Sequence, residues 1–237
     1  MEYQGVSTVK DRRYQWRFGP VVIASLLLAL LRPGLARLIG DRPSFDLLFS
    51  LLIVTVLVLL LDQRRHRKTA TALGVFALVF IWLGHVFDGR TGTVIFLLGT
   101  AIHLVFLGYA LYRILNSIMQ SRTTANALSG AVCGYLLLGI IWGDAYMAVE
   151  IIEPGSFHAV ESFGDAIGNP KENPGVYEYF SFVTLTTLGY GDISPASETA
   201  RNLAWIEAMT GQLYLAIFIA GLVGQHLAER RLEQSDS

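Results

Sequence analysis

Long apolar runs separated by short polar breaks dominate the hydropathy pattern of this chain. A helix needs about 20 apolar residues to cross a bilayer, and six segments approach or exceed that length. They run from Phe18 to Ile39, Phe45 to Leu61, Thr69 to Phe87, Thr93 to Tyr112, about Asn126 to Glu150 and about Asn202 to Leu227. The pattern predicts an all-α membrane protein with six transmembrane helices, the first of which pack as antiparallel hairpins.

Composition agrees with a membrane protein. Hydrophobic residues make up 53% of the 237 residues and charged residues only 16%, whereas soluble domains carry about 25% charge. The formal net charge of −1 leaves no dominant basic face, so we expect no nucleic-acid partner. The single cysteine, Cys133, excludes an intrachain disulfide and a paired-cysteine metal motif.

Charged residues at the ends of the apolar runs predict the orientation. The first 17 residues are polar and resemble no cleaved signal peptide, so we expect the first run to remain as a span. It is interrupted at Arg32 and Pro33, so Arg32 would have to reach outward to the membrane surface. Placing both termini in the cytoplasm puts 12 of the 18 Lys and Arg residues inside, as the positive-inside rule requires.

A long connection separates the fifth and sixth spans. It runs from Ile151 to Arg201 and contains YEYFSFVT, an aromatic stretch too short to cross the membrane. This stretch predicts a re-entrant helix. Acidic residues such as Glu150 and Glu178 are expected to be solvated in this outer loop. His85 and His103, one on each of two spans, are expected to be packing residues rather than metal ligands.

The segment TLTTLGYGDISP, from Thr184 to Pro195, follows the re-entrant stretch. Non-helical backbone at membrane depth is tolerated where it lines a watery path. Carbonyl oxygens can replace the water around a cation there, and Gly189 and Gly191 reach the positive φ angles that align successive carbonyls. The Leu188 and Tyr190 side chains would then pack against the re-entrant helix. One strand supplies only part of each oxygen ring, so a symmetric homo-oligomer is implied.

TTLGYGD, from Thr186 to Asp192, resembles the selectivity filter of tetrameric potassium channels, whose usual form is TTVGYGD. The resemblance extends over Tyr177 to Leu227, with Ala127 to Glu150 as outer helix. It implies an extended filter, a homotetramer and K⁺ as the permeant ion. The implied ion ligands are Thr187, Leu188, Gly189 and Tyr190, with Gly191 completing the filter and Asp192 at the outer mouth. Leu188 departs from the usual valine, which alters packing rather than carbonyl chemistry.

The same resemblance assigns roles on the last span. Gly211 lies twenty residues after Gly191, where potassium channels place a hinge glycine, although close helix packing is the alternative. By the same spacing the cavity and lower constriction would be lined by Gln212, Leu215, Ile219 and Val223.

Thr186 and Glu207 are the predicted supports of the filter. Many such channels carry a pore-helix glutamate that braces the carboxylate after GYG, but Val183 occupies that position here. Glu207, an ionisable residue within a span, is our candidate replacement. The alternative is that Glu207 lies near the outer surface and is solvated.

Gating is not readable from the sequence. The fourth span has only Arg113 at its inner end, so conventional voltage sensing is not expected. The predicted domains are a cytoplasmic segment (1–17), a four-helix membrane domain (18–112), an amphipathic linker helix (113–125), a pore domain (126–227) and a short cytoplasmic tail (228–237).

We therefore expect a potassium-selective channel in a prokaryotic plasma membrane. Its expected partners are the lipid bilayer and the permeant ion K⁺, and no cofactor is expected. A non-selective cation channel and an accessory or potassium-uptake subunit are the alternatives. An enzyme is not expected, because the chain has no HExxH, no GxSxG and no paired intramembrane aspartates.

Overall fold

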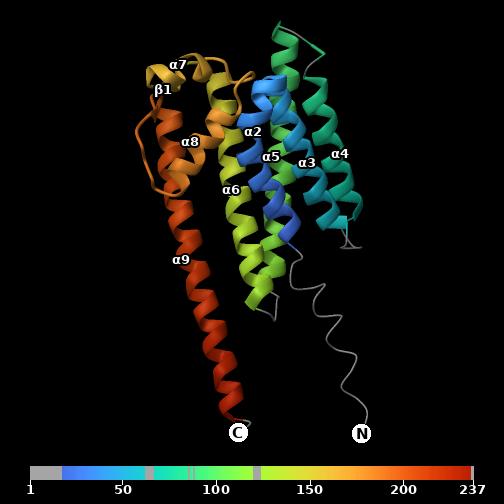
Figure 1. Cartoon of the computed structure of the whole chain (residues 1–237), viewed down its shortest axis with the longest axis vertical. Helices are drawn as coiled ribbons and strands as arrows, with labels where there is room; N and C mark the ends of the chain where they lie inside the picture. Colours follow the sequence, from blue (N-terminus) through green and yellow to red (C-terminus); the bar gives the residue numbers. More distant parts are fainter. Residues whose placement is uncertain (1–17, 62–66, 85, 88, 120–123, 236–237) are drawn as a thin grey trace.

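A computed structural model of the chain describes residues 18–61, 67–84, 86–87, 89–119 and 124–235. The segment 1–17 lies outside the described residues. The described part is mostly helical, as expected, with long helices lying side by side and one helix extending beyond the others (Figure 1). The long helices are α2 (Gly19–Ile39), α3 (Asp41–Leu61), α4 (Arg67–Leu83), α5 (Gly89–Met119), α6 (Thr124–Ile152) and α9 (Glu198–Ser235).

Four helical segments in the described residues are long and apolar enough to cross a membrane. They are Gly19–Ile39, Asp41–Leu61, Gly89–Ile118 and Ala127–Ile152. The chain is therefore a multi-pass membrane protein. Helix α4 has 17 residues and begins with Arg67 and Lys68, so it falls short of the length of a usual span. That α4 and α9 also cross the membrane, which would give six spans in all, stays a prediction.

The apolar faces of the first helices form one core. Helix α2 packs on α3, α3 on α4, and α4 on α5, while α5 and α2 both contact α6. Fully buried side chains at this core include Leu52, Ile53 and Phe106. The N-terminal helices thus pack directly on the outer helix of the expected pore.

The expected linker helix is not a separate element. Helix α5 runs unbroken from Gly89 to Met119, across the predicted boundary at Tyr112. No proline interrupts this stretch, and Ile114 and Ile118 bury their side chains in the protein core rather than facing a membrane surface. Residues 120–123, also assigned to the linker, lie outside the described residues.

The long connection before α9 is a folded unit. Strand β1 (Phe157–Ala159) pairs antiparallel with β2 (Ile193–Pro195), with His158 opposite Ser194. Helices α7 (Glu161–Ile167) and α8 (Gly175–Leu185) lie between the strands, and α8 packs on both α6 and α9. Helix α8 has 11 residues and is the predicted re-entrant helix. Because β2 is the end of the segment TLTTLGYGDISP, its pairing with β1 fixes where the chain leaves the predicted filter.

Candidate ion-conduction site

The backbone of the predicted filter alternates in conformation. Thr187, Gly189 and Gly191 have φ angles of 57°, 58° and 77°, all in the left-handed region. Thr187 is the one non-glycine residue with positive φ in the described part of the chain. A β-branched residue there is strained by about 1–3 kcal/mol, a cost often found at functional sites. The alternation reproduces the conformation that the glycine spacing predicted.

Hydrogen bonds tie the start of the filter to the end of α8. The N–H of Thr187 donates to the carbonyl of Thr184 at 2.9 Å, and the N–H of Leu188 donates to the carbonyl of Val183 at 2.9 Å. Within the described residues, no hydrogen bond engages the carbonyl oxygens of residues 187–191. Those oxygens are therefore available to a ligand from outside the chain.

The side chains of the filter do not pack as predicted within one chain. Leu188 is 55% exposed and Tyr190 66% exposed, so neither is covered by α8 of its own chain. The residues on both sides, Thr186 and Gly191, are exposed as well. The hydroxyl of Thr186 donates to the Phe182 carbonyl at 2.6 Å and closes the end of α8.

A tyrosine holds the carboxylate at the outer end of the filter. The hydroxyl of Tyr179 donates to Oδ2 of Asp192 at 2.5 Å, while Oδ1 accepts the N–H of Ile193. The hydrogen bond to this carboxylate raises the pKa of Tyr179 to about 12. The main-chain carbonyl of Asp192 accepts the N–H of Val160 at 2.9 Å. The sequence favoured core packing or an aromatic cuff around Tyr190 for Tyr179, and did not predict its bond to Asp192. Its place one helical turn before Val183 on α8 was a usable signal.

Glu207 joins three helices, α6, α8 and its own helix α9. Its side chain is fully buried, so the solvated alternative is wrong. Oε1 accepts the hydroxyl of Ser181 on α8 at 2.5 Å, and Oε2 accepts the hydroxyl of Tyr146 on α6. Ser181 Oγ also lies 2.7 Å from the carbonyl of Gly139. Glu207 thus contacts the pore helix rather than Asp192.

Gly211 lies where α9 crosses the end of α8. A Cβ atom built on Gly211 would overlap the carbonyl oxygen of Leu185. The hydroxyl of Tyr135 donates to the same oxygen at 3.1 Å. Helix α9 continues through Gly211 without a break. These contacts are those of the close-packing alternative, and the hinge role stays a prediction.

The predicted cavity residues are only partly described. Gln212 and Leu215 are exposed on α9 of the single chain. The side chains of Ile219 and Val223 lie outside the described residues. Their predicted role at a lower constriction is therefore untested.

Two residues of the expected solvated loop are instead buried. Glu150 is 5% exposed and accepts the N–H of Gly155 at 2.7 Å, and Glu178 on α8 is 7% exposed. Close to Glu178, the guanidinium of Arg32 lies against Gly175, where an added Cβ would overlap it. Arg32 therefore contacts the start of the pore helix instead of reaching outward, because the α2–α6 packing brings it there.

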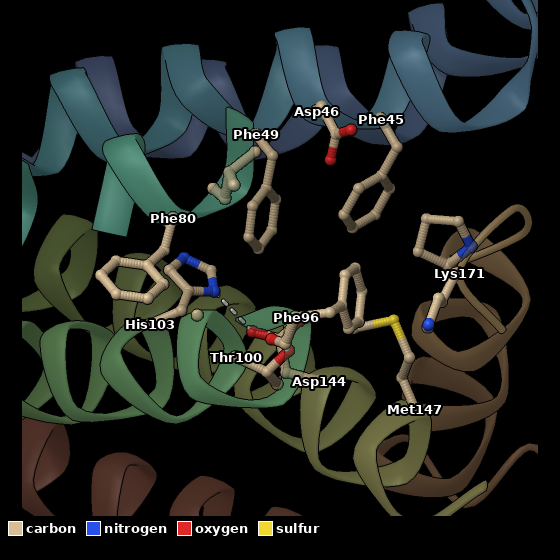
Figure 2. Close-up of a pocket in the computed structure, with 13 residues that line it drawn as sticks. Phe45, Asp46, Phe49, Phe80, Phe96, Thr100, His103, Asp144, Met147 and Lys171 are labelled. Atoms are coloured by element: carbon tan, nitrogen blue, oxygen red, sulfur yellow. Dashed lines mark hydrogen bonds and ion pairs between the residues drawn. The ribbon is translucent and has the colours of Figure 1, made fainter. Parts of the chain in front are cut away.

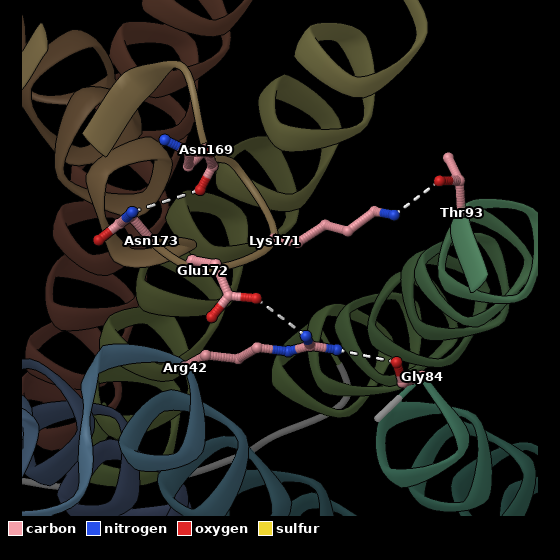
Figure 3. A network of polar contacts seen from close by, with 7 residues as sticks. All are labelled: Arg42, Gly84, Thr93, Asn169, Lys171, Glu172 and Asn173. Atoms are coloured by element: carbon pink, nitrogen blue, oxygen red, sulfur yellow. Dashed lines mark hydrogen bonds and ion pairs between the residues drawn. The ribbon is translucent and has the colours of Figure 1, made fainter. Parts of the chain in front are cut away.

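Polar contacts fasten the turn before α8 to the N-terminal helices (Figure 3). Arg42 at the start of α3 donates to Glu172 at 3.1 Å and to the carbonyl of Gly84 at 2.9 Å. Lys171 donates to the hydroxyl of Thr93 on α5 at 2.6 Å. These contacts join α3 and α5 to the turn that precedes α8.

A buried histidine and aspartate join α5 to α6. His103 Nδ1 lies 2.8 Å from Asp144 Oδ2, and both side chains are 4% exposed. They line a cavity with Phe45 and Phe96, and Lys171 lies at its edge (Figure 2). His103 packs between helices, as the sequence predicted. Its carboxylate partner, Asp144, was not predicted. His85 lies outside the described residues.

Comparison with known proteins identifies the C-terminal part of the chain. Residues 134–225 match the family model described as "Ion channel". A two pore potassium channel a of rice, Oryza sativa subsp. japonica, is 38% identical over 53 residues, which cover 22% of this chain and 15% of the rice protein. No solved structure matches the chain. The part of the chain that holds α8, the predicted filter and most of α9 is therefore similar to an ion channel domain, and not to an enzyme.

Proposed function

We propose that this protein is a potassium-selective channel that conducts K⁺ passively through the carbonyl oxygens of residues 187–191. The observation that carries the proposal is the alternation of left-handed φ angles at Thr187, Gly189 and Gly191. Such an alternation turns successive carbonyls toward one side of the strand, and rings of these oxygens replace the hydration shell of the ion. The ligands are Thr187, Leu188, Gly189 and Tyr190, and Asp192 stands at the outer mouth.

The working channel is a homotetramer. A single strand cannot surround an ion, and channels of the pore family assemble as oligomers. The exposed side chains of Leu188 and Tyr190 fit this assembly, because a neighbouring chain can cover them. Trp205, Met209, Leu213 and Ile217 are further apolar residues exposed on α9 of the single chain, and they are available for the same subunit contacts.

Two sets of contacts support the filter. Tyr179 holds Asp192 from α8, and Glu207 holds Ser181, which positions α8 itself. Together they replace the usual pore-helix glutamate, whose position is occupied here by Val183. Gly211 contributes by allowing α9 to approach the end of α8, and Gln212, Leu215, Ile219 and Val223 line the path below.

The remaining parts are assigned by expectation. The four N-terminal helices modulate the pore without conventional voltage sensing, since Arg90 and Arg113 are the only Arg or Lys residues in the described helix α5. The protein lies in a plasma membrane of prokaryotic type with both termini in the cytoplasm. K⁺ is the permeant ion, and no cofactor takes part.

The test is a reversal-potential measurement on purified protein in a planar bilayer, with potassium on one side and sodium on the other. We expect a potential close to the potassium equilibrium value for the wild type and a loss of selectivity in Gly191→Ala. Gly155→Ala is the matched control, because Gly155 has a φ of 85° and equally open surroundings but lies far from the filter in sequence. It should keep the wild-type potential.

Each other result identifies a different function. A wild-type potential near zero, with current, would indicate a non-selective cation channel. Oligomers of fewer than four 26.1 kDa chains, together with an absence of current, would indicate an accessory or uptake subunit. Equal loss of selectivity in Gly155→Ala would show that the effect arises from general backbone strain and not from the filter.

A further inference from the structure

Four ionisable side chains on four helices lie near one another between the N-terminal helices and the pore helix. His103 on α5 bonds to Asp144 on α6 at 2.8 Å. Asp144 and Arg32 both interact electrostatically with Glu178 on α8. We call these four residues, His103, Asp144, Glu178 and Arg32, the charge cluster.

Packing confirms that the members are close. A Cβ atom on Gly143, the residue before Asp144, would lie 2.9 Å from the Cα of Glu178, so α6 and α8 touch here. The Arg32 guanidinium lies against Gly175, three residues before Glu178 on the same helix. Within the described residues, three buried atoms of the cluster have no hydrogen-bond partner, namely Arg32 Nη1, Glu178 Oε1 and His103 Nε2.

The charges of the cluster do not balance without an additional proton. Asp144 and Glu178 are two acids and Arg32 is one permanent cation, so the ionised set carries one uncompensated negative charge. Burying such a charge is costly, and buried charges are normally paired. One proton restores neutrality. His103 can hold it, because Asp144 accepts the bond from Nδ1 and leaves Nε2 as the second protonation site.

Charged side chains also line the cavity beside His103. Asp46 from α3 and Lys171 from the turn before α8 line the same cavity as His103 (Figure 2), carry opposite charges and are partly exposed. Helix α4 contributes only the apolar Phe80 and Ile81. Asp41 lies 3.9 Å from Arg32 and is 43% exposed, so its charge is largely solvated. The cavity of about 40 Å³ is large enough for a water molecule.

The cluster leads directly to the filter. Glu178 is followed on α8 by Tyr179, whose hydroxyl holds Asp192 at the outer mouth. A change in repulsion between Asp144 and Glu178 would shift α8 against α6 and disturb the Tyr179–Asp192 bond. Resting on the proposed function, we propose that proton binding at His103 of the charge cluster regulates conduction, with the protonated, neutral cluster holding the pore helix in its conducting position.

The experiment compares potassium currents at an outer pH of about 5 and about 8, the range in which histidine changes charge. The protein is the full-length channel in a planar bilayer with constant inner pH. We expect the wild-type current to be at least about fivefold larger at the lower pH, the lower end of usual coupling between sites. His103→Gln should abolish this dependence and fix the current at a low value.

A second variant separates regulation from misfolding. Glu178→Gln removes one acid and makes the cluster neutral without a proton, so its current should stay high at both pH values. His158→Gln is the matched control, because His158 is exposed on β1, and it should retain the wild-type dependence. A misfolded protein cannot produce the high, constant current expected of Glu178→Gln.

The outcomes separate the two proposals. A potassium-selective current that does not change with pH, increases with pH, or keeps its dependence in His103→Gln would overturn the regulation alone. Loss of the dependence in His158→Gln would assign it to the outer mouth and would also overturn the regulation. A wild-type reversal potential without potassium selectivity, or no current at either pH, would contradict the proposed function as well.

Discussion

The hydroxyl of Tyr179 lies 2.5 Å from Oδ2 of Asp192 and joins the pore helix to the residue that follows the filter. The two residues are 13 positions apart. Sheet β1–β2 holds the other side of Asp192, because its carbonyl accepts the N–H of Val160. Asp192, the residue after the proposed filter, is thus held from both directions.

Tyr179→Phe should weaken potassium selectivity or the persistence of the current. The substitution removes a hydrogen bond to a charged group, which is worth about 1.5–3 kcal/mol, and frees the Asp192 carboxylate to move. Reversal potential and current decay during sustained recording measure the effect. Tyr177→Phe is the comparison, since it removes a hydroxyl of the same helix that bonds Ile167 instead. A similar change in both variants would speak against a specific role for Tyr179.

The Tyr179–Asp192 bond should withstand alkaline solution. A phenol normally ionises near a pKa of about 10, and the carboxylate raises the pKa of Tyr179 to about 12. Because the pKa is raised in the folded protein, the hydrogen bond of Tyr179 contributes fully to the free energy of unfolding below the ordinary pKa. This contribution is lost as the pH rises through the raised pKa. Wild type and Tyr179→Phe should therefore differ in thermal stability up to about pH 10 and converge by about pH 12. A difference that disappears near neutral pH would exclude this account.

Glu207→Ala should destabilise the channel. It leaves the buried hydroxyl of Tyr146 without its acceptor, at about 1–3 kcal/mol for an unsatisfied group. Ser181 loses one of two acceptors, because its hydroxyl also lies 2.7 Å from the carbonyl of Gly139. The unfolding temperature in detergent and the single-channel current report the loss. Glu198→Ala changes an exposed acid at the start of the same helix and should have little effect. Equal stability of the two variants would remove Glu207 from the filter support.

Gly211→Ala distinguishes close packing from a hinge. The added methyl group would overlap the Leu185 carbonyl, and such overpacking costs about 1–3 kcal/mol. Close packing predicts lower thermal stability and loss of current. Gly221→Ala, on the same helix with open space around it, should be tolerated. A stable Gly211→Ala channel with altered open probability would instead support the hinge.

Leu188→Val should preserve the reversal potential. The substitution restores the common form of the filter and leaves the backbone carbonyls unchanged, so ion selectivity should persist while conductance changes. Single-channel conductance and reversal potential, recorded together, separate the two quantities. A large shift in reversal potential would mean that the Leu188 side chain itself controls selectivity.

The local sequence was sufficient to predict three of the long helices and the positive φ angles of two glycines in the predicted filter. Apolar runs of spanning length predict α2, α3 and α6 closely, because a helix in lipid must satisfy its own backbone. The glycines at 189 and 191 predict positive φ, because only glycine reaches it at low cost. Thr187 reaches positive φ against its own preference, so the glycine spacing did not predict its conformation.

The contacts between distant segments depended on tertiary packing. Tyr179 with Asp192, Glu207 with Ser181 and Tyr146, and His103 with Asp144 are joined because α6, α8 and α9 pack together and α5 packs on α6. The sequence places each of these groups on its element but gives no helix rotation, and rotation decides whether a polar side chain meets lipid, water or a partner. Arg32 illustrates the difference. Its charge predicted a side chain that reaches the membrane surface, whereas helix packing places its guanidinium against Gly175 at the start of α8. Burial in an apolar interior then makes such pairings obligatory, because an unpaired buried polar group is costly.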